Sequence, residues 1–202
     1  MIRFIKFYAL EIYTAISMSI LLIAGIVGYL SAIQKFALVY IFLFVLHEWE
    51  EMKYPGGFAD SIAKMIGVEI NEEMKRASRI PTSILLLAFT ICPLVFHEYP
   101  IAILPIAFLG LFEGIVHIFA VKLFKCAKFY SPGLATAEIQ AAVSIILFAY
   151  LIKNGALPFW GYLTGSAIML VCFIAMQKSI TAMVGFRYSD LPKKIKEQLQ
   201  KQ

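Results

Sequence analysis

Six long apolar runs are the feature that most constrains how this chain can fold. They cover residues 8–30, 36–52, 81–97, 101–121, 132–152 and 156–177. A helix of roughly 17–25 apolar residues is long enough to cross about 30 Å of hydrocarbon. Because a bilayer offers no water to backbone polar groups, such segments must be helical. The sequence therefore predicts an all-α fold, a polytopic bundle of six transmembrane helices.

The scarcity of charge supports this interpretation. Of the 202 residues, 61% are hydrophobic and only 15% are charged, whereas about a quarter of an average soluble domain is charged. The same balance excludes a disordered chain, and three scattered cysteines exclude a disulfide-stapled scaffold. The net charge of +5 does not predict nucleic-acid binding, because the basic residues lie in short runs between apolar segments.

The distribution of basic residues predicts an orientation. If the N-terminus is cytoplasmic and there are six spans, all of the 18 Lys and Arg residues except Lys35 and Lys153 lie in cytoplasmic segments. This asymmetry follows the positive-inside rule, and an odd number of spans would destroy it. We therefore expect a multi-pass protein of the cell membrane with both termini in the cytoplasm.

Two segments lie outside the predicted spans. Residues 1–177 form the expected transmembrane domain, in which residues 53–80 connect the second and third spans. Apolar side chains recur there at helical spacing from Phe58 to Ile80, which predicts an amphipathic helix in the cytoplasmic interface. Residues 178–202 form a basic cytoplasmic tail, whose lysines are expected near the anionic headgroups of membrane lipids.

Ionisable residues inside apolar spans are costly and therefore mark candidate functional sites. The second span runs into His47-Glu48-Trp49-Glu50-Glu51. Residues three and four positions apart share a helix face. We therefore expect His47, Glu50 and Glu51 on one face of this helix. Glu48 is expected to point elsewhere.

Two further spans carry such residues. Glu113 and His117 in the fourth span are four residues apart and share a face. The fifth span opens with Ser131-Pro132-Gly133, which predicts an N-cap followed by proline at the first helical position. Glu138 follows one to two turns further in.

The predicted topology brings these residues to one depth. At 1.5 Å per residue, His47 lies roughly 18 Å from the outer face, and the pair Glu113 and His117 lies roughly 20–26 Å from it. Glu138, counted from the inner face, lies about 20 Å from the outer one. Carboxylates and imidazoles from three helices are therefore expected to converge.

This combination of residues is typical of a metal site, because a divalent ion keeps buried carboxylates ionised. The candidate ligands are His47, Glu50, Glu51, Glu113, His117 and Glu138. Mixed oxygen and imidazole ligands suit iron, manganese or zinc. The site could hold one ion, with a glutamate as general base, or two ions bridged by Glu50 or Glu51. The carboxylates of Glu50 and Glu51 are the candidate catalytic groups. Interhelical hydrogen bonding or a proton relay without metal is the alternative.

The segment from His47 to Glu51, followed by Pro55-Gly56-Gly57-Phe58, resembles a family of integral membrane proteins named after its H-x-x-E-E motif. His117 and the segment Tyr130-Ser131-Pro132-Gly133 with Thr136 are similar to later signature regions of that family, so the resemblance covers about residues 38–150. It implies that His47, Glu50, Glu51 and His117 are site residues. Where the resemblance leads us to expect an Asn, four residues before the second histidine, this chain has Glu113. The family is of unknown function, so the resemblance implies no reaction.

These observations favour a metal-dependent enzyme whose site lies in the cytoplasmic half of the bilayer and acts on a lipid-like or small apolar substrate. Oxidation at an iron or manganese centre and hydrolysis by a zinc-bound hydroxide both fit. A cation- or proton-coupled transporter is the second hypothesis, and a non-catalytic membrane scaffold is the third. The outer halves of the second, fourth and fifth spans are nearly all apolar, which favours the one-sided pocket of an enzyme over a conduit.

Overall fold

The computed structural model describes residues 2–123 and 130–200, and this part of the chain is helical throughout, with short connections. The α-helices are α1 (Ile2–Phe7), α2 (Ala9–Ile26), α3 (Ala32–Met52), α4 (Phe58–Ile66), α5 (Glu72–Val95), α6 (Leu104–Leu123), α7 (Leu134–Lys153), α8 (Phe159–Met183) and α9 (Leu191–Gln200). Two short 3-10 helices, η1 (Pro100–Ile103) and η2 (Tyr188–Asp190), precede α6 and α9.

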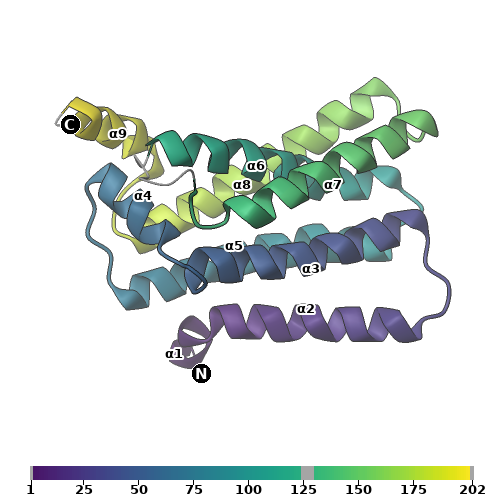
Figure 1. Cartoon of the computed structure of the whole chain (residues 1–202), viewed down its shortest axis with the longest axis horizontal. Coiled ribbons are helices and arrows are strands. Elements are labelled where there is room, and N and C mark those ends of the chain that lie inside the picture. Colours follow the sequence, from purple (N-terminus) through teal and green to yellow (C-terminus); the bar gives the residue numbers. More distant parts are fainter. Residues whose placement is uncertain (1, 124–129, 201–202) are drawn as a thin grey trace.

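Six of these elements are long and apolar enough to cross a membrane. They are α2, α3, α5, the continuous segment Pro100–Leu123, α7 and α8. The long helices lie side by side along the long axis of the molecule, and both termini lie at the same end (Figure 1). The predicted all-α bundle of six spans is therefore confirmed, and its length and composition are those of a multi-pass membrane protein.

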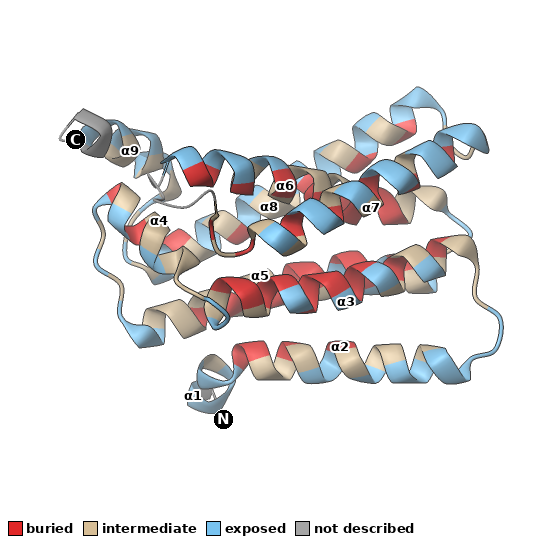
Figure 2. Cartoon of the chain, viewed as in Figure 1, coloured by how far each residue is buried: buried red, intermediate tan, exposed pale blue. Residues whose placement is uncertain are grey.

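The bundle is arranged so that α3 lies in its interior. Helix α3 packs against α2, α5 and α7, while α6 packs against α7 and α8 (Figure 1). Buried residues concentrate where α3, α5, α6 and α7 face one another (Figure 2). Helix α2 buries only four residues, and the outward faces of α2, α7 and α8 are exposed. Those exposed faces are rich in Ile, Leu, Val and Phe, as is expected of surfaces that contact lipid.

The connection between the second and third spans differs from the prediction. Helix α4 is present but ends at Ile66, and the helix that contains the third span begins at Glu72 rather than near residue 81. The reason is local, because the side chain of Asn71 accepts a hydrogen bond from Met74 N (2.8 Å) and so caps a new helix. Pro81 lies inside α5 without ending it.

Three smaller expectations also change. Helix α7 begins at Leu134 with Gly133 as its N-cap, so Pro132 is not its first helical residue. The sixth span continues to Met183, and the tail beyond it forms η2 and α9. Of the basic residues in the predicted cytoplasmic segments, Lys125, Lys128 and Lys201 lie outside the described residues.

Helices α6 and α7 approach closely because α6 carries glycines on the contact face. A Cβ atom at Gly110 would lie 2.6 Å from Ser144 Oγ, and one at Gly114 would lie 2.8 Å from Ala141 Cβ. Small residues at such positions allow the backbones of two membrane helices to pack together. This contact fixes α6, which carries Glu113 and His117, against the N-terminal half of α7.

We expect Gly110→Ala to lower the free energy of unfolding by about 1–3 kcal/mol, because its methyl group would overlap atoms of α7. Chemical unfolding of the protein in detergent measures this change. Gly25→Ala is the matched control, since nothing lies within 4 Å of a Cβ at that position in α2. Equal stabilities of the two variants would contradict the packing role of Gly110.

Candidate metal site

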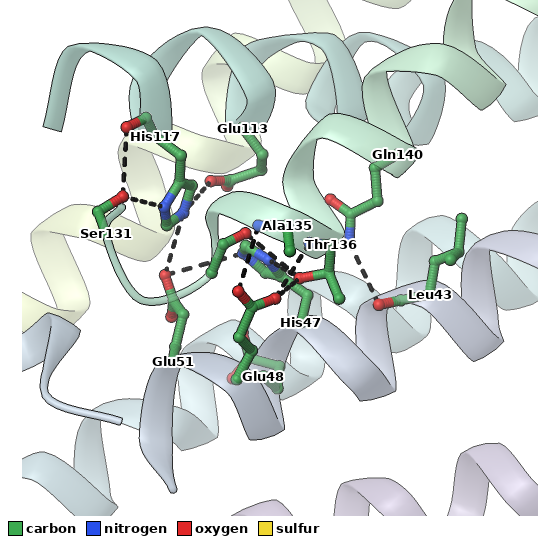
Figure 3. A network of polar contacts seen from close by, with 12 residues as sticks. Leu43, His47, Glu48, Glu51, Glu113, His117, Ser131, Ala135, Thr136 and Gln140 are labelled. Atoms are coloured by element: carbon green, nitrogen blue, oxygen red, sulfur yellow. Dashed lines mark hydrogen bonds and ion pairs between the residues drawn. The ribbon is translucent and has the colours of Figure 1, made fainter. Parts of the chain in front are cut away.

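Two histidines and two glutamates converge between α3 and α6. His47 and Glu51 come from α3, and Glu113 and His117 come from α6. Glu51 Oε1 lies 3.4 Å from His117 Nε2 and 3.7 Å from His47 Nε2, and Glu113 Oε2 lies 3.8 Å from His117 Nε2 (Figure 3). Ligand atoms of His47, Glu113 and His117 all lie within 4.8 Å of one another, so these three residues could hold a metal ion.

The spacing of these atoms fits ligands around an ion better than it fits direct hydrogen bonds. N–H···O hydrogen bonds are commonly about 2.9–3.0 Å long. Tetrahedral ligands at about 2.0–2.1 Å from a metal are separated by about 3.4 Å. Within the described chain, His117 Nε2 is buried and makes no hydrogen bond. A buried imidazole nitrogen of this kind requires a partner, and a metal ion would provide one.

The opposite nitrogen of each imidazole is held by a hydroxyl group. His47 Nδ1 lies 3.0 Å from Thr136 Oγ1, and His117 Nδ1 lies 3.3 Å from Ser131 Oγ. Thr136 donates its hydroxyl proton to Glu50, and Ser131 donates its own to the backbone carbonyl of His117. Each hydroxyl oxygen is therefore left to accept from a protonated Nδ1, which directs the Nε2 lone pairs of both histidines into the cluster.

Glu50 takes part in this arrangement from outside the cluster. Its carboxylate accepts hydrogen bonds from the hydroxyl of Tyr130 (2.6 Å), from the backbone of Ala135 (3.2 Å) and from the backbone of Thr136 (3.0 Å). It thus caps the start of α7 and neutralises the positive end of that helix. Burial and the contact with Glu50 raise the pKa of Tyr130, which keeps the phenol protonated as a donor.

Glu138 is not part of the group. It is exposed, although α7 carries it past the same region of the bundle. Depth alone predicted its convergence, but its carboxylate lies beside Gly114 of α6, where Oε1 would be 3.7 Å from a Cβ atom, and it makes no ion pair with either histidine among the described residues. Of the predicted ligands, the structure brings together His47, Glu51, Glu113 and His117, and it does not bring Glu50 or Glu138 into contact with both histidines.

Arg79 is the functional residue that the sequence reasoning missed. Its Nη1 lies 2.8 Å from Glu48 Oε2 and 2.8 Å from Glu51 Oε2, and all three side chains are buried. Glu48 points away from the histidines, as expected, but toward this guanidinium rather than toward lipid. The sequence signal that could have found it is Asn71, a residue type favoured at helix N-caps, because a helix that begins at Glu72 carries Arg79 into the bundle.

Two segments enclose one side of the cluster. The ring of Phe58, the first residue of α4, stacks on His117 with 4.7 Å between ring centroids. Gly133 has a φ of +93°, and a Cβ there would lie 2.5 Å from His117 Cε1 and 3.0 Å from Glu51 Cγ. Only glycine meets both the left-handed backbone and the close approach to the imidazole. The Pro-Gly-Gly-Phe and Ser-Pro-Gly segments thus enclose the site.

A cavity of about 250 Å³ borders the cluster. Its polar wall is formed by His47, Glu48, Glu51, Arg79 and Glu113. The remaining walls are mostly apolar side chains of α4, α5, α6 and α8. An apolar pocket with a few convergent polar groups is the usual form of a small-molecule site.

The charges along this wall do not balance by themselves. Three carboxylates, those of Glu48, Glu51 and Glu113, face one guanidinium, that of Arg79. Lys75 also lines the cavity, but it forms 2.7 Å ion pairs with two acidic residues of its own. If the three carboxylates are ionised, a divalent cation would neutralise the excess of two negative charges.

Fold and site together describe a multi-pass membrane protein with a buried group of histidines and glutamates that could hold a metal ion. Comparisons with models of protein families, with curated proteins and with solved structures found no match to this chain. The resemblance to the H-x-x-E-E family therefore stays a prediction.

We expect Arg79→Met to lower the free energy of unfolding by about 3–5 kcal/mol, because it would leave buried carboxylates without their counter-charge. Unfolding in detergent measures the effect. Arg76→Met is the matched control one turn earlier. Arg76 contacts the backbone oxygen and ring of Phe7 rather than a buried carboxylate, so its loss should cost about 1 kcal/mol or less. Similar losses in both variants would show that the buried ion pairs do not stabilise the fold.

Proposed function

We propose that the protein is a metal-dependent enzyme that acts within the membrane on a lipid-like or small apolar substrate. The observation that carries this proposal is the convergence of two imidazole Nε2 atoms and two glutamate carboxylates beside an apolar cavity. An ion held there would have protein ligands on one side and the cavity on the other. A catalytic metal site needs such an open position.

The set of available side chains favours one ion. Glu50 is committed to the start of α7, and Glu138 is exposed. The group that contacts both histidines is therefore too small for two ions with independent ligand sets. Two histidines with one carboxylate bind zinc in several hydrolases and bind iron(II) in oxygenases. With either metal, the second carboxylate of the cluster is placed to act as a general base.

The identity of the metal separates two reactions. Zinc would support hydrolysis by a metal-bound hydroxide, and iron or manganese would support oxidation. Glu51 is the candidate base, because it lies nearest to both imidazoles and is oriented by Arg79. For Glu50 we propose a positioning role through Thr136 rather than a role as ligand.

Packing beyond the cluster favours an enzyme over a transporter. Toward the other end of the bundle, Tyr40 and Ser144 are buried and hydrogen-bonded to each other (2.8 Å). Large apolar residues are also buried in this half of the bundle, among them Ile103, Leu104 and Leu147. A conduit would need a polar path through this layer. From the positions of the basic residues, we propose that the cavity lies at the cytoplasmic side of the membrane, where both termini also lie.

Elemental analysis of detergent-purified protein, prepared without chelators and under reducing conditions, tests the proposal. We expect about one equivalent of iron, manganese or zinc in the wild type. The ion should be lost in His47→Ala, Glu113→Ala and His117→Ala, because each change removes one of the three residues whose ligand atoms lie within 4.8 Å of one another. His97→Ala is the control, since this third histidine lies at the opposite end of the bundle and should leave the metal content unchanged. A wild type without stoichiometric metal would refute the proposal.

Thr136→Val separates positioning from ligation. The variant keeps the shape of the side chain but removes the hydroxyl that joins Glu50 to His47. We expect the affinity for the metal to fall about 10–100-fold, as for other groups that orient a ligating histidine. Competition with a chelator of known affinity measures this change. Thr90→Val, a buried threonine bonded only within α5, should have the wild-type affinity. Equal affinities of the two variants would contradict the role of Thr136.

A further inference from the structure

The cavity beside the cluster is elongated along the helices. On α5 it extends from Met74, five residues before Arg79, to Leu86, seven residues after it. At 1.5 Å per residue these limits lie about 7 Å and about 10 Å from the level of Arg79. On α6 it continues to Leu109, one turn beyond Glu113. The cluster therefore lies partway along one wall of a slot, not at the slot's end.

The two ends of the slot differ in chemistry. The inner end, meaning the end deeper in the bundle and farther from α4 and α9, is lined by apolar residues, namely Phe44, Leu85, Leu86, Leu109, Phe112 and Phe173. The end covered by α4 and α9 is also largely apolar, with Ile62, Ile66 and Leu191 among its lining residues. It differs in that polar side chains line it as well, among them Ser78, Gln177 and Thr181. Lys75 at that end is neutralised by its ion pairs with Asp60 and Glu72. Beyond the cluster the slot thus ends in an apolar wall, whereas its mouth offers a few polar groups and nearly no net charge.

We infer that the substrate of the proposed enzyme is a single-chain amphiphile with an uncharged head, bound with its tail against Leu86 and Leu109 and its head near α4 and α9. This inference rests on the proposed function. The volume of about 250 Å³ lies below the usual range of about 300–1,000 Å³ for ligand pockets, so the slot holds one chain rather than two. The reacting group of such a chain lies beside the cluster, and the inner wall limits how far the tail can extend.

Photolabelling tests this inference without requiring turnover. The probe is hexadecanol with a diazirine near its terminal methyl group, added to the purified full-length protein in detergent. After irradiation and proteolysis, mass spectrometry should find the label on the segments that contain Leu85, Leu86 or Leu109. Excess unlabelled hexadecanol should remove it.

Variants of α5 provide the matched comparison. Leu86→Trp fills the inner end of the slot and should reduce this labelling at least about tenfold, because a closed apolar wall tolerates added volume poorly. Ile84→Trp is the control, since Ile84 is exposed and does not line the cavity. It should label as the wild type does. Leu109→Phe repeats the test from α6, and an unchanged metal content shows that each variant is folded.

Three results would overturn the inference. The first is that the label is found only on exposed residues such as Ile84. The second is that Leu86→Trp and Leu109→Phe leave the labelling unchanged. The third is that a diazirine phospholipid with two acyl chains labels the slot equally well. The outcome is distinct from that of the metal analysis. Bound metal without labelling of the slot would refute only the substrate class, and labelling without metal would refute the proposed enzyme.

Discussion

The burial of carboxylates in an apolar bundle is the constraint on which the rest of this site depends. Glu48, Glu51 and Glu113 lie where a lone ionised group would be strongly unfavourable. Arg79 compensates part of their charge through two short ion pairs. Because one guanidinium cannot neutralise three carboxylates, the remaining charge must be removed by protonation or by a bound cation. The directed lone pairs of His47 and His117 favour the cation.

Each polar residue of the segment from His47 to Glu51 has a different partner. His47 is oriented by Thr136, Glu48 binds Arg79, and Glu50 caps the start of α7. Glu51 contacts Arg79 and both imidazoles. One short stretch of helix thereby joins α3 to its neighbours α5, α6 and α7. These different partners explain why the adjacent residues Glu50 and Glu51 are not equivalent.

The six spans could be predicted from the sequence because the hydrophobic length required by a bilayer leaves few alternatives. The sequence also predicted that His47 lies near the helix face that carries Glu113 and His117, since helical spacing and depth follow from counting residues. Depth does not determine how a helix is rotated, which is why Glu138 was expected in the cluster although it is exposed.

The role of Arg79 was not predicted for a related reason. The charged residues around Asn71 made the following turns look like part of an interfacial helix. The cap at Asn71 is a local hydrogen bond that starts α5 earlier and carries Arg79 into the bundle. Hydropathy averaged over a long window does not register an interaction of this kind.

The order in which the site residues occur along the chain has a consequence for biosynthesis. The cluster draws on α3 and α6, but both imidazoles are oriented by residues that follow residue 130, namely Ser131 and Thr136. A nascent chain that has inserted only its first four spans therefore contains all four converging side chains without the hydroxyls that direct them. Both imidazoles are oriented only when α7 packs against α6, so the proposed metal centre would be completed only after insertion of the fifth span.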